Sequence, residues 1–249
     1  MKNFILCLFL LLVIISANSQ TTILKDKGSW LTLSNSVKLS DKVYFGSVIQ
    51  MRRVGFFENT QGFLIMPGIS YKLSKNISVG VGYLWYKYFT AGVLHSPINK
   101  EENRIWQHLT INSVLGKYKL NHRFMLEERF KDAIILNNES EYIIDGISYS
   151  QRFRYRMAVV FNLLKLKNNK IVLGKLSNEI RIRFQTGLSE PDFDQNNLEA
   201  LLGYQLLGNS KIWVGYGRFY YKANGTKFVS NNILHATLSC NFDITKKNL

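Results

Sequence analysis

Charged residues occur at alternate positions in the middle of the sequence, and their types limit the chemistry that they could perform. Most are arginines, with two glutamates among them. The ten residues of this series are Arg104, Arg123, Glu127, Arg129, Arg152, Arg154, Arg156, Glu179, Arg181 and Arg183. A guanidinium binds a carboxylate through two parallel N–H donors, so such residues form salt bridges or hold an acidic ligand. Because arginines outnumber glutamates, positive potential should remain where they gather.

The sequence has none of the motifs that mark common catalytic centres. The nucleophile elbow, the phosphate-binding loop and the zinc-protease helix are all missing. The histidines are isolated, with no metal-ligand spacing between them: His95, His108, His122 and His235. We therefore predict no catalytic residue, no cofactor and no metal site, and we predict that the protein is not an enzyme.

The first residues predict export. Lys2 precedes the unbroken apolar run Phe4–Ile15, and small residues follow at Ser16–Ser19. This is the pattern of a secretory signal peptide. The run has about 12 residues, whereas a membrane-spanning helix needs about 20. We predict cleavage between Ser19 and Gln20, with residues 1–19 as signal peptide and residues 20–249 as a single domain.

Composition narrows the class of protein further. The formal net charge is +15, but an exported chain has no access to nucleic acid. Aromatic residues make up 13% and there are only three prolines, which argues against disorder. Cleavage of the signal peptide would remove Cys7 and leave Cys240 as the only cysteine, so no internal disulfide is expected.

From Trp30 onward the dominant period is two residues, which is typical of β-strands. In one segment Phe153, Tyr155 and Met157 alternate with arginines. On this basis we predict eleven strand segments: Ser29–Leu39, Lys42–Arg52, Gln61–Leu73, Ile77–Tyr88, Glu102–Val114, Tyr118–Phe130, Ser148–Leu163, Ile171–Gln185, Asn196–Leu206, Lys211–Tyr221 and Asn232–Asp243. Pro67 lies within a strand, where we expect a bulge or a locally frayed pair.

The connections between these segments alternate between short turns and longer polar stretches, as in transmembrane barrels. Many segments also reach the 9–11 residues that a tilted membrane strand needs. Because bacterial single-chain barrels have an even number of strands, we predict a closed antiparallel transmembrane β-barrel of 10 or 12 strands. Ten strands result if the first segment is not a full strand. Twelve result if Thr21–Leu24 or Ala133–Ile144 is a further strand.

The two faces of these strands differ in polarity. The apolar face is bulky and continuous, and an interior of this size would hardly hold so many large groups. Tyrosine and tryptophan recur near strand ends, as in the girdles of membrane barrels. We therefore predict that the apolar face meets lipid and the arginines face the lumen. We prefer a salt-bridged plug, with an anion-attracting pore or acidic-ligand site as the alternative.

Several strings of the sequence resemble the uncharacterised bacterial family known as domain of unknown function 2490. They are ENRIWQHL (Glu102–Leu109), LNHRFMLEERF (Leu120–Phe130), QRFRYRM (Gln151–Met157), NEIRIRF (Asn178–Phe184), LLGYQL (Leu201–Leu206) and NNILHATLSCNFD (Asn231–Asp243). The resemblance covers essentially the whole chain after the signal peptide. It implies an exported outer-membrane barrel, and it implies no catalytic residues because no activity is assigned to the family.

These observations predict an integral β-barrel of the bacterial outer membrane with an arginine- and glutamate-lined lumen. Its role would be structural or the permeation of small anions. The expected partners are outer-membrane lipid and lipopolysaccharide, and small anionic solutes, without nucleic acid; the oligomeric state is open. Two alternatives remain. One is a phospholipase-like outer-membrane enzyme, and the other is a soluble periplasmic ligand-binding barrel.

Overall fold

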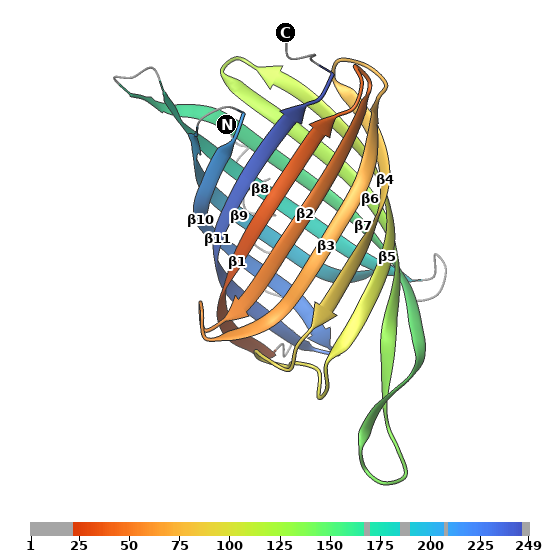
Figure 1. The fold of residues 1–249 in the computed structure, drawn as a ribbon. Coiled ribbons are helices and arrows are strands. Elements are labelled where there is room, and N and C mark those ends of the chain that lie inside the picture. The colour runs from red at the N-terminus through yellow and green to blue at the C-terminus, as the bar shows by residue number, and fades with distance from the viewer. Residues whose placement is uncertain (1–21, 167–169, 185–189, 207–208, 246–249) are drawn as a thin grey trace, which may run out of the picture.

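The chain folds into eleven β-strands that close into one barrel (Figure 1). The structure is a computed structural model, and it describes residues 22–166, 170–184, 190–206 and 209–245. The strands are β1 (Thr22–Lys38), β2 (Val43–Val54), β3 (Asn59–Lys72), β4 (Ile77–Tyr88), β5 (Lys100–Leu115), β6 (Tyr118–Leu136), β7 (Tyr142–Lys165), β8 (Ile171–Phe184), β9 (Asp192–Gln205), β10 (Lys211–Asn224) and β11 (Lys227–Asp243). The predicted signal peptide lies outside the described residues.

The predicted closed all-β barrel is confirmed, but the prediction of ten or twelve strands is wrong. Each strand pairs with its neighbours in the sequence, and β1 pairs with β11. In a meander of eleven strands the first and last run in the same direction. The closing pair is therefore parallel, whereas the other ten pairs are antiparallel. This parallel seam runs from Thr22 opposite Lys227 to Lys38 opposite Asp243.

Neither segment that we considered as a twelfth strand is a separate element. Residues 22–24 are the start of β1, which continues without a break into the first predicted segment. Residues 133–144 form the outer ends of β6 and β7. These two strands are joined by a five-residue connection, and their hairpin projects beyond one rim of the barrel (Figure 1).

The connections lie at two rims, which we call the short-turn rim and the loop rim. The turn at Ser74–Asn76 and the connection from β9 to β10 both lie at the short-turn rim. At the loop rim, the strands extend into several of the longer polar stretches that we predicted as connections. For example, β10 continues to Asn224 and β11 starts at Lys227. Among the fully described connections at this rim, only residues 89–99, between β4 and β5, form a long loop.

Pro67 interrupts the pairing of β3 with β4, as expected for a residue without an N–H. Ile65 lies opposite Trp85 and Gly68 opposite Gly82, which is the same register on both sides. Met66 and Pro67 pair with Val48 and Ser47 of β2 but with no residue of β4. This is a locally frayed pair rather than a bulge.

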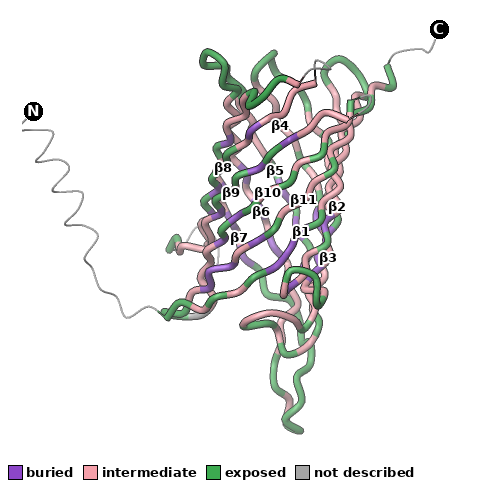
Figure 2. The backbone as a smooth tube through the Cα atoms, turned by 90° about the vertical axis from the view of Figure 1, so that its left-hand side faces the viewer, coloured by how far each residue is buried: buried purple, intermediate pink, exposed green. Residues whose placement is uncertain are grey.

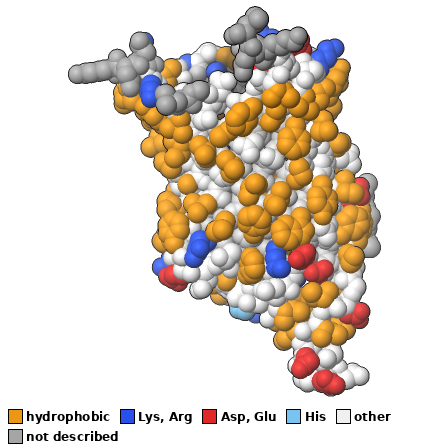
Figure 3. All heavy atoms as spheres, in the orientation of Figure 1, with side chains coloured by type: hydrophobic (Ala, Val, Ile, Leu, Met, Phe, Trp, Pro, Cys, Tyr) orange, Lys and Arg blue, Asp and Glu red, His pale blue; other side chains and the backbone are white. Residues whose placement is uncertain are grey.

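Burial separates the two faces of the wall. In a single-layer barrel an outward side chain is open to the surroundings, so a buried residue must face inward. The buried positions follow the strands through the body of the barrel, while the projecting hairpin is largely exposed (Figure 2). Outward residues such as Val81, Leu198 and Tyr216 are apolar and exposed. Apolar side chains cover much of the wall between the rims (Figure 3). No helix in the described part of the chain is long and apolar enough to cross a membrane.

An engineered disulfide can test the parallel pairing of β1 with β11. Asn35 on β1 lies opposite Cys240 on β11, and paired residues of a sheet point to the same face. In the Asn35→Cys variant the two sulfurs should bond under oxidising conditions, because facing strand positions are within the reach of a disulfide. Mass spectrometry of the digested protein should then detect a peptide from β1 linked to the Cys240 peptide. The control is Ser36→Cys, whose side chain points to the other face. Equal cross-linking in both variants would contradict this seam.

Candidate functional site in the barrel interior

Glu102 is a fully buried carboxylate near the loop rim, and two arginines bind it. Arg104 donates from Nε to Oε1 at 2.7 Å and from Nη2 to Oε2 at 3.1 Å. Arg129 on β6 donates to the same two oxygens at 2.5 and 3.2 Å. The Tyr88 hydroxyl donates a further bond of 2.5 Å to Oε2. These charge-assisted bonds take the place of the water that burial removes.

Glu127, also fully buried, is the central carboxylate. Arg154 donates from Nη1 to its Oε1 at 2.6 Å, and Arg152 donates from Nε to its Oε2 at 2.6 Å. The Nη1 atom of Arg104 lies 3.6 Å from Oε1, which connects Glu127 to the group around Glu102. Arg152 also donates from Nη1 to Asp194 Oδ2 on β9 at 2.9 Å. The contacts thus cross several strands.

Glu179 on β8 is the third carboxylate. Arg154 donates from Nη2 and Arg181 from Nε to its Oε1, at 2.7 and 2.8 Å. Arg123 on β6 reaches across β7 and donates to Oε2 at 2.7 Å. Because Arg154 binds both Glu127 and Glu179, the three groups form one arginine–glutamate network. Its members are Glu102, Arg104, Arg123, Glu127, Arg129, Arg152, Arg154, Glu179, Arg181 and Asp194.

Eight of the ten residues singled out in the sequence belong to this network, and two do not. Arg156 donates to the Asn121 amide oxygen at 3.0 Å instead of to a carboxylate. Arg183 is partly exposed and lies 3.3 Å from Asp192, which also binds Lys222.

Sequence reasoning missed Glu102 and Asp194. Both lie near the loop-rim ends of their strands, at positions that we assigned to a strand end or a loop. Glu102 has the same parity as Arg104, which is the signal that could have identified it.

The register explains why carboxylates are needed at these places. Arg104 lies directly opposite Arg129 on the neighbouring strand. Likewise, Arg154 lies opposite Arg181. Like charges in facing positions repel each other. Each facing pair shares one carboxylate, Glu102 for the first and Glu179 for the second, so repulsion is replaced by two salt bridges.

The opposite half of the interior is aromatic and apolar. The guanidinium of Arg52 on β2 lies 3.9 Å from the ring centre of Trp30 and 4.9 Å from that of Tyr86. Phe219 on β10 packs edge-on against Trp30 at 4.4 Å. A second cluster comprises Leu64, Leu84, Tyr86, Trp106 and Met125. The ring of Trp106 lies over the backbone of Gly68 and Gly82, where any Cβ would be within 2.4 Å of it.

A cavity of about 300 Å³ lies inside the barrel between these two halves. Its lining includes five residues of the network, namely Arg104, Arg129, Arg152, Arg181 and Asp194. On the outer side the loop of residues 89–99 covers the cavity. The Val93 N–H of this loop donates to Asp26 Oδ2 on β1 at 3.1 Å, so the loop reaches over β2 and β3. We call this cavity the chamber.

A hydroxyl–imidazole–carboxylate group also lies inside the barrel. The Nε2 atom of His235 is 3.2 Å from Thr32 Oγ1, and its Nδ1 is 3.0 Å from Glu199 Oε1. That order is found in nucleophilic triads. Here, however, the Thr32 hydroxyl accepts a bond of 2.8 Å from Gln50, and Nε2 is equally close to Thr237. None of these residues lines the chamber, so the group acts as an interior hydrogen-bond network. Among the described residues no cluster of three or more His, Cys, Asp or Glu side chains is placed to hold a metal ion.

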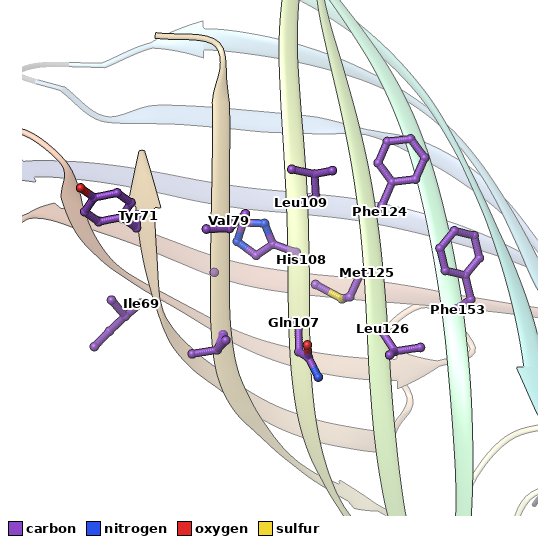
Figure 4. Close-up of a pocket in the computed structure, with 12 residues that line it drawn as sticks. Ile69, Tyr71, Val79, Gln107, His108, Leu109, Phe124, Met125, Leu126 and Phe153 are labelled. Atoms are coloured by element: carbon purple, nitrogen blue, oxygen red, sulfur yellow. The ribbon is translucent and has the colours of Figure 1, made fainter. Parts of the chain in front are cut away.

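A shallow groove lies on the outer wall over β3 to β7 (Figure 4). Its outward side chains are almost all apolar, such as Ile69, Phe124 and Phe153, and Gln107 is the polar exception. This groove has no array of ionisable groups that could perform chemistry.

Fold and interior together define a closed eleven-stranded β-barrel with an apolar outer wall and buried Arg/Glu pairs. The chain belongs to the family described as Protein of unknown function (DUF2490), whose model matches residues 27–232. No curated protein and no solved structure matches the chain.

Removing the central carboxylate should destabilise the barrel. In Glu127→Ala, Arg152 and Arg154 lose a shared buried partner, and breaking a buried pair costs about 3–5 kcal/mol. We expect a loss of this size in the free energy of unfolding, measured by denaturant titration in detergent micelles. Glu139→Ala, on the exposed tip of the β6–β7 hairpin, is the control and should change stability by less than about 0.5 kcal/mol. Equal stability of the two variants would show that the network contributes nothing.

Proposed function

We propose that this protein is an integral β-barrel of the bacterial outer membrane, exported by a cleaved signal peptide. The observation that carries the proposal is the polarity of the wall: apolar side chains point outward on the strands, while charged side chains are buried inside. A soluble barrel would have the opposite arrangement, because water favours charge outside and apolar groups inside. In hydrocarbon only a closed sheet satisfies every backbone group, and this barrel leaves no unpaired edge strand.

We propose a structural role for the interior, as a plug that closes the lumen. Side chains almost fill barrels of about eight strands, and an aqueous channel is typical of sixteen or more. At eleven strands, arginines reach over a neighbouring strand to their carboxylates, and aromatic and apolar side chains pack in other parts of the interior. Anion permeation is the second candidate, because the six arginines of the network face four carboxylates and leave two positive charges in excess.

The enzyme alternative has less support. His122 points to the outer wall with Phe124 and Leu126, as a lipid hydrolase would need. Its imidazole Nδ1 lies 2.9 Å from the hydroxyl of Tyr155, and no serine is bonded to it in the described part of the chain. We therefore keep the proposal that the protein is not an enzyme.

A charge on the outer wall tests the contact with lipid. Val81 is outward and exposed near the middle of β4. In a membrane, Val81→Arg should lower the free energy of unfolding by about 2–4 kcal/mol, whereas arginine near the interface costs at most about 1 kcal/mol. Leu73→Arg in the short-turn rim is the matched control. The measurement is reversible unfolding in lipid vesicles. If Val81→Arg costs no more than Leu73→Arg, the wall does not lie in hydrocarbon.

Conductance tests the plug. The protein in a planar bilayer should give no steady current, because side chains occlude the lumen. Replacing Arg154 and Arg181 by serine should open ion-conducting events, since both side chains are buried inside the barrel and bind Glu179 there. Lys117→Ser with Lys119→Ser, at exposed positions of the short-turn rim, should remain silent. A steady anion-selective current through the unaltered protein would instead support the permeation candidate.

A further inference from the structure

We propose that the chamber is a binding site for a small organic anion that carries a planar ring. This role goes beyond that of a closed barrel. It does not depend on what surrounds the outer wall, because the residues that line the chamber belong to the barrel interior and to the loop of residues 89–99.

The lining of the chamber is mostly positively charged, which favours a negatively charged ligand. Eight cationic side chains and one carboxylate, Asp194, line the chamber. Most of these cations already pair with carboxylates of the network or with Asp192. Arg52, Lys100 and Lys131 are different, because none of them lies within 4 Å of a carboxylate in the described part of the chain. An anion would neutralise these three charges, which have no acidic partner of their own.

Unused hydrogen-bonding atoms point to the same place. Trp30 Nε1, Ser96 Oγ and Asn231 Oδ1 are buried and have no hydrogen-bond partner among the described residues. All three residues line the chamber, and Trp30 is more than nine-tenths buried. Buried polar groups are nearly always satisfied, so three unsatisfied atoms around one cavity indicate an occupant with polar atoms.

The two sides of the chamber suit the two parts of such a ligand. Trp30, Tyr86 and Phe219 come from β1, β4 and β10 and form an aromatic side. Lys100, Arg129 and Lys131 come from β5 and β6 and form a cationic side. A ring would pack against the former, and a carboxylate or phosphate would bind to the latter. A volume of about 300 Å³ is at the lower end for ligand pockets, which limits the ligand to a single small ring system.

Calorimetric titration of the full-length protein in detergent micelles tests this proposal. The probes are benzoate, phenyl phosphate, benzyl alcohol and inorganic phosphate. We expect benzoate or phenyl phosphate to bind at least about tenfold more tightly than the neutral alcohol and the ring-free anion. The Kd of benzoate compared with that of phenyl phosphate shows whether the chamber prefers a carboxylate or a phosphate. The proposal is overturned if neither aromatic anion binds, or if benzyl alcohol or inorganic phosphate binds as tightly.

Variants locate the binding. Lys100→Gln with Lys131→Gln should raise the Kd of the preferred anion about tenfold or more. Since neither lysine forms an ion pair, we expect the fold to persist, and thermal unfolding without probe checks this. Lys117→Gln with Lys119→Gln is the matched control and should leave the Kd unchanged. Trp30→Phe keeps a ring but removes the N–H, so it should weaken binding of the anion, which should still bind more tightly than the alcohol. Equal affinity in the chamber and control variants would place binding elsewhere, whatever the Val81→Arg experiment shows about lipid.

Discussion

Three buried carboxylates, each bound by at least two guanidiniums, determine how one half of this barrel is organised. The facing pairs Arg104–Arg129 and Arg154–Arg181 would repel each other in an interior shielded from water. Glu102 and Glu179 turn each repulsion into a shared salt-bridge group, and Glu127 connects the two. Such a network also specifies register. A slip of one residue between neighbouring strands would turn a whole row of arginines to the apolar face.

The width of the barrel explains why the two halves use different side chains. At eleven strands the interior is wider than aliphatic side chains can fill, so residues with long reach are required. On β5 to β9 these are arginines, two of which reach over a neighbouring strand to a carboxylate. Elsewhere they are large rings, and Trp106 of β5 covers β3 and β4 only because Gly68 and Gly82 leave space above the backbone. The chamber lies between the network and the aromatic side, and both contribute to its lining.

Much of this fold could be predicted because strand periodicity is local. The eleven predicted segments each correspond to one strand. Within β7, and again within β8, the arginines occupy alternate positions, which predicts that they lie on one face of the strand. The count went wrong only where a general rule about even numbers was preferred to the segments themselves. Other features depend on how the barrel closes, and the sequence of a single strand does not predict them. Trp30, Arg52, Tyr86 and Phe219 come from four strands, and no pattern within one strand predicts their contact. Glu102 was missed because strand ends and loops are both polar.

An odd number of strands places a demand on the seam that even-numbered barrels avoid. The bonds between β1 and β11 are those of a parallel pair, which is slightly less stable per residue than an antiparallel pair. Interior side chains add contacts across this seam. His235 on β11 contacts Thr32 on β1, and Trp30 on β1 packs against Phe219 on β10, beyond β11. His235 in turn binds Glu199 on β9. The seam is therefore held by side chains that span from β1 to β9, and the interior packing also closes the barrel.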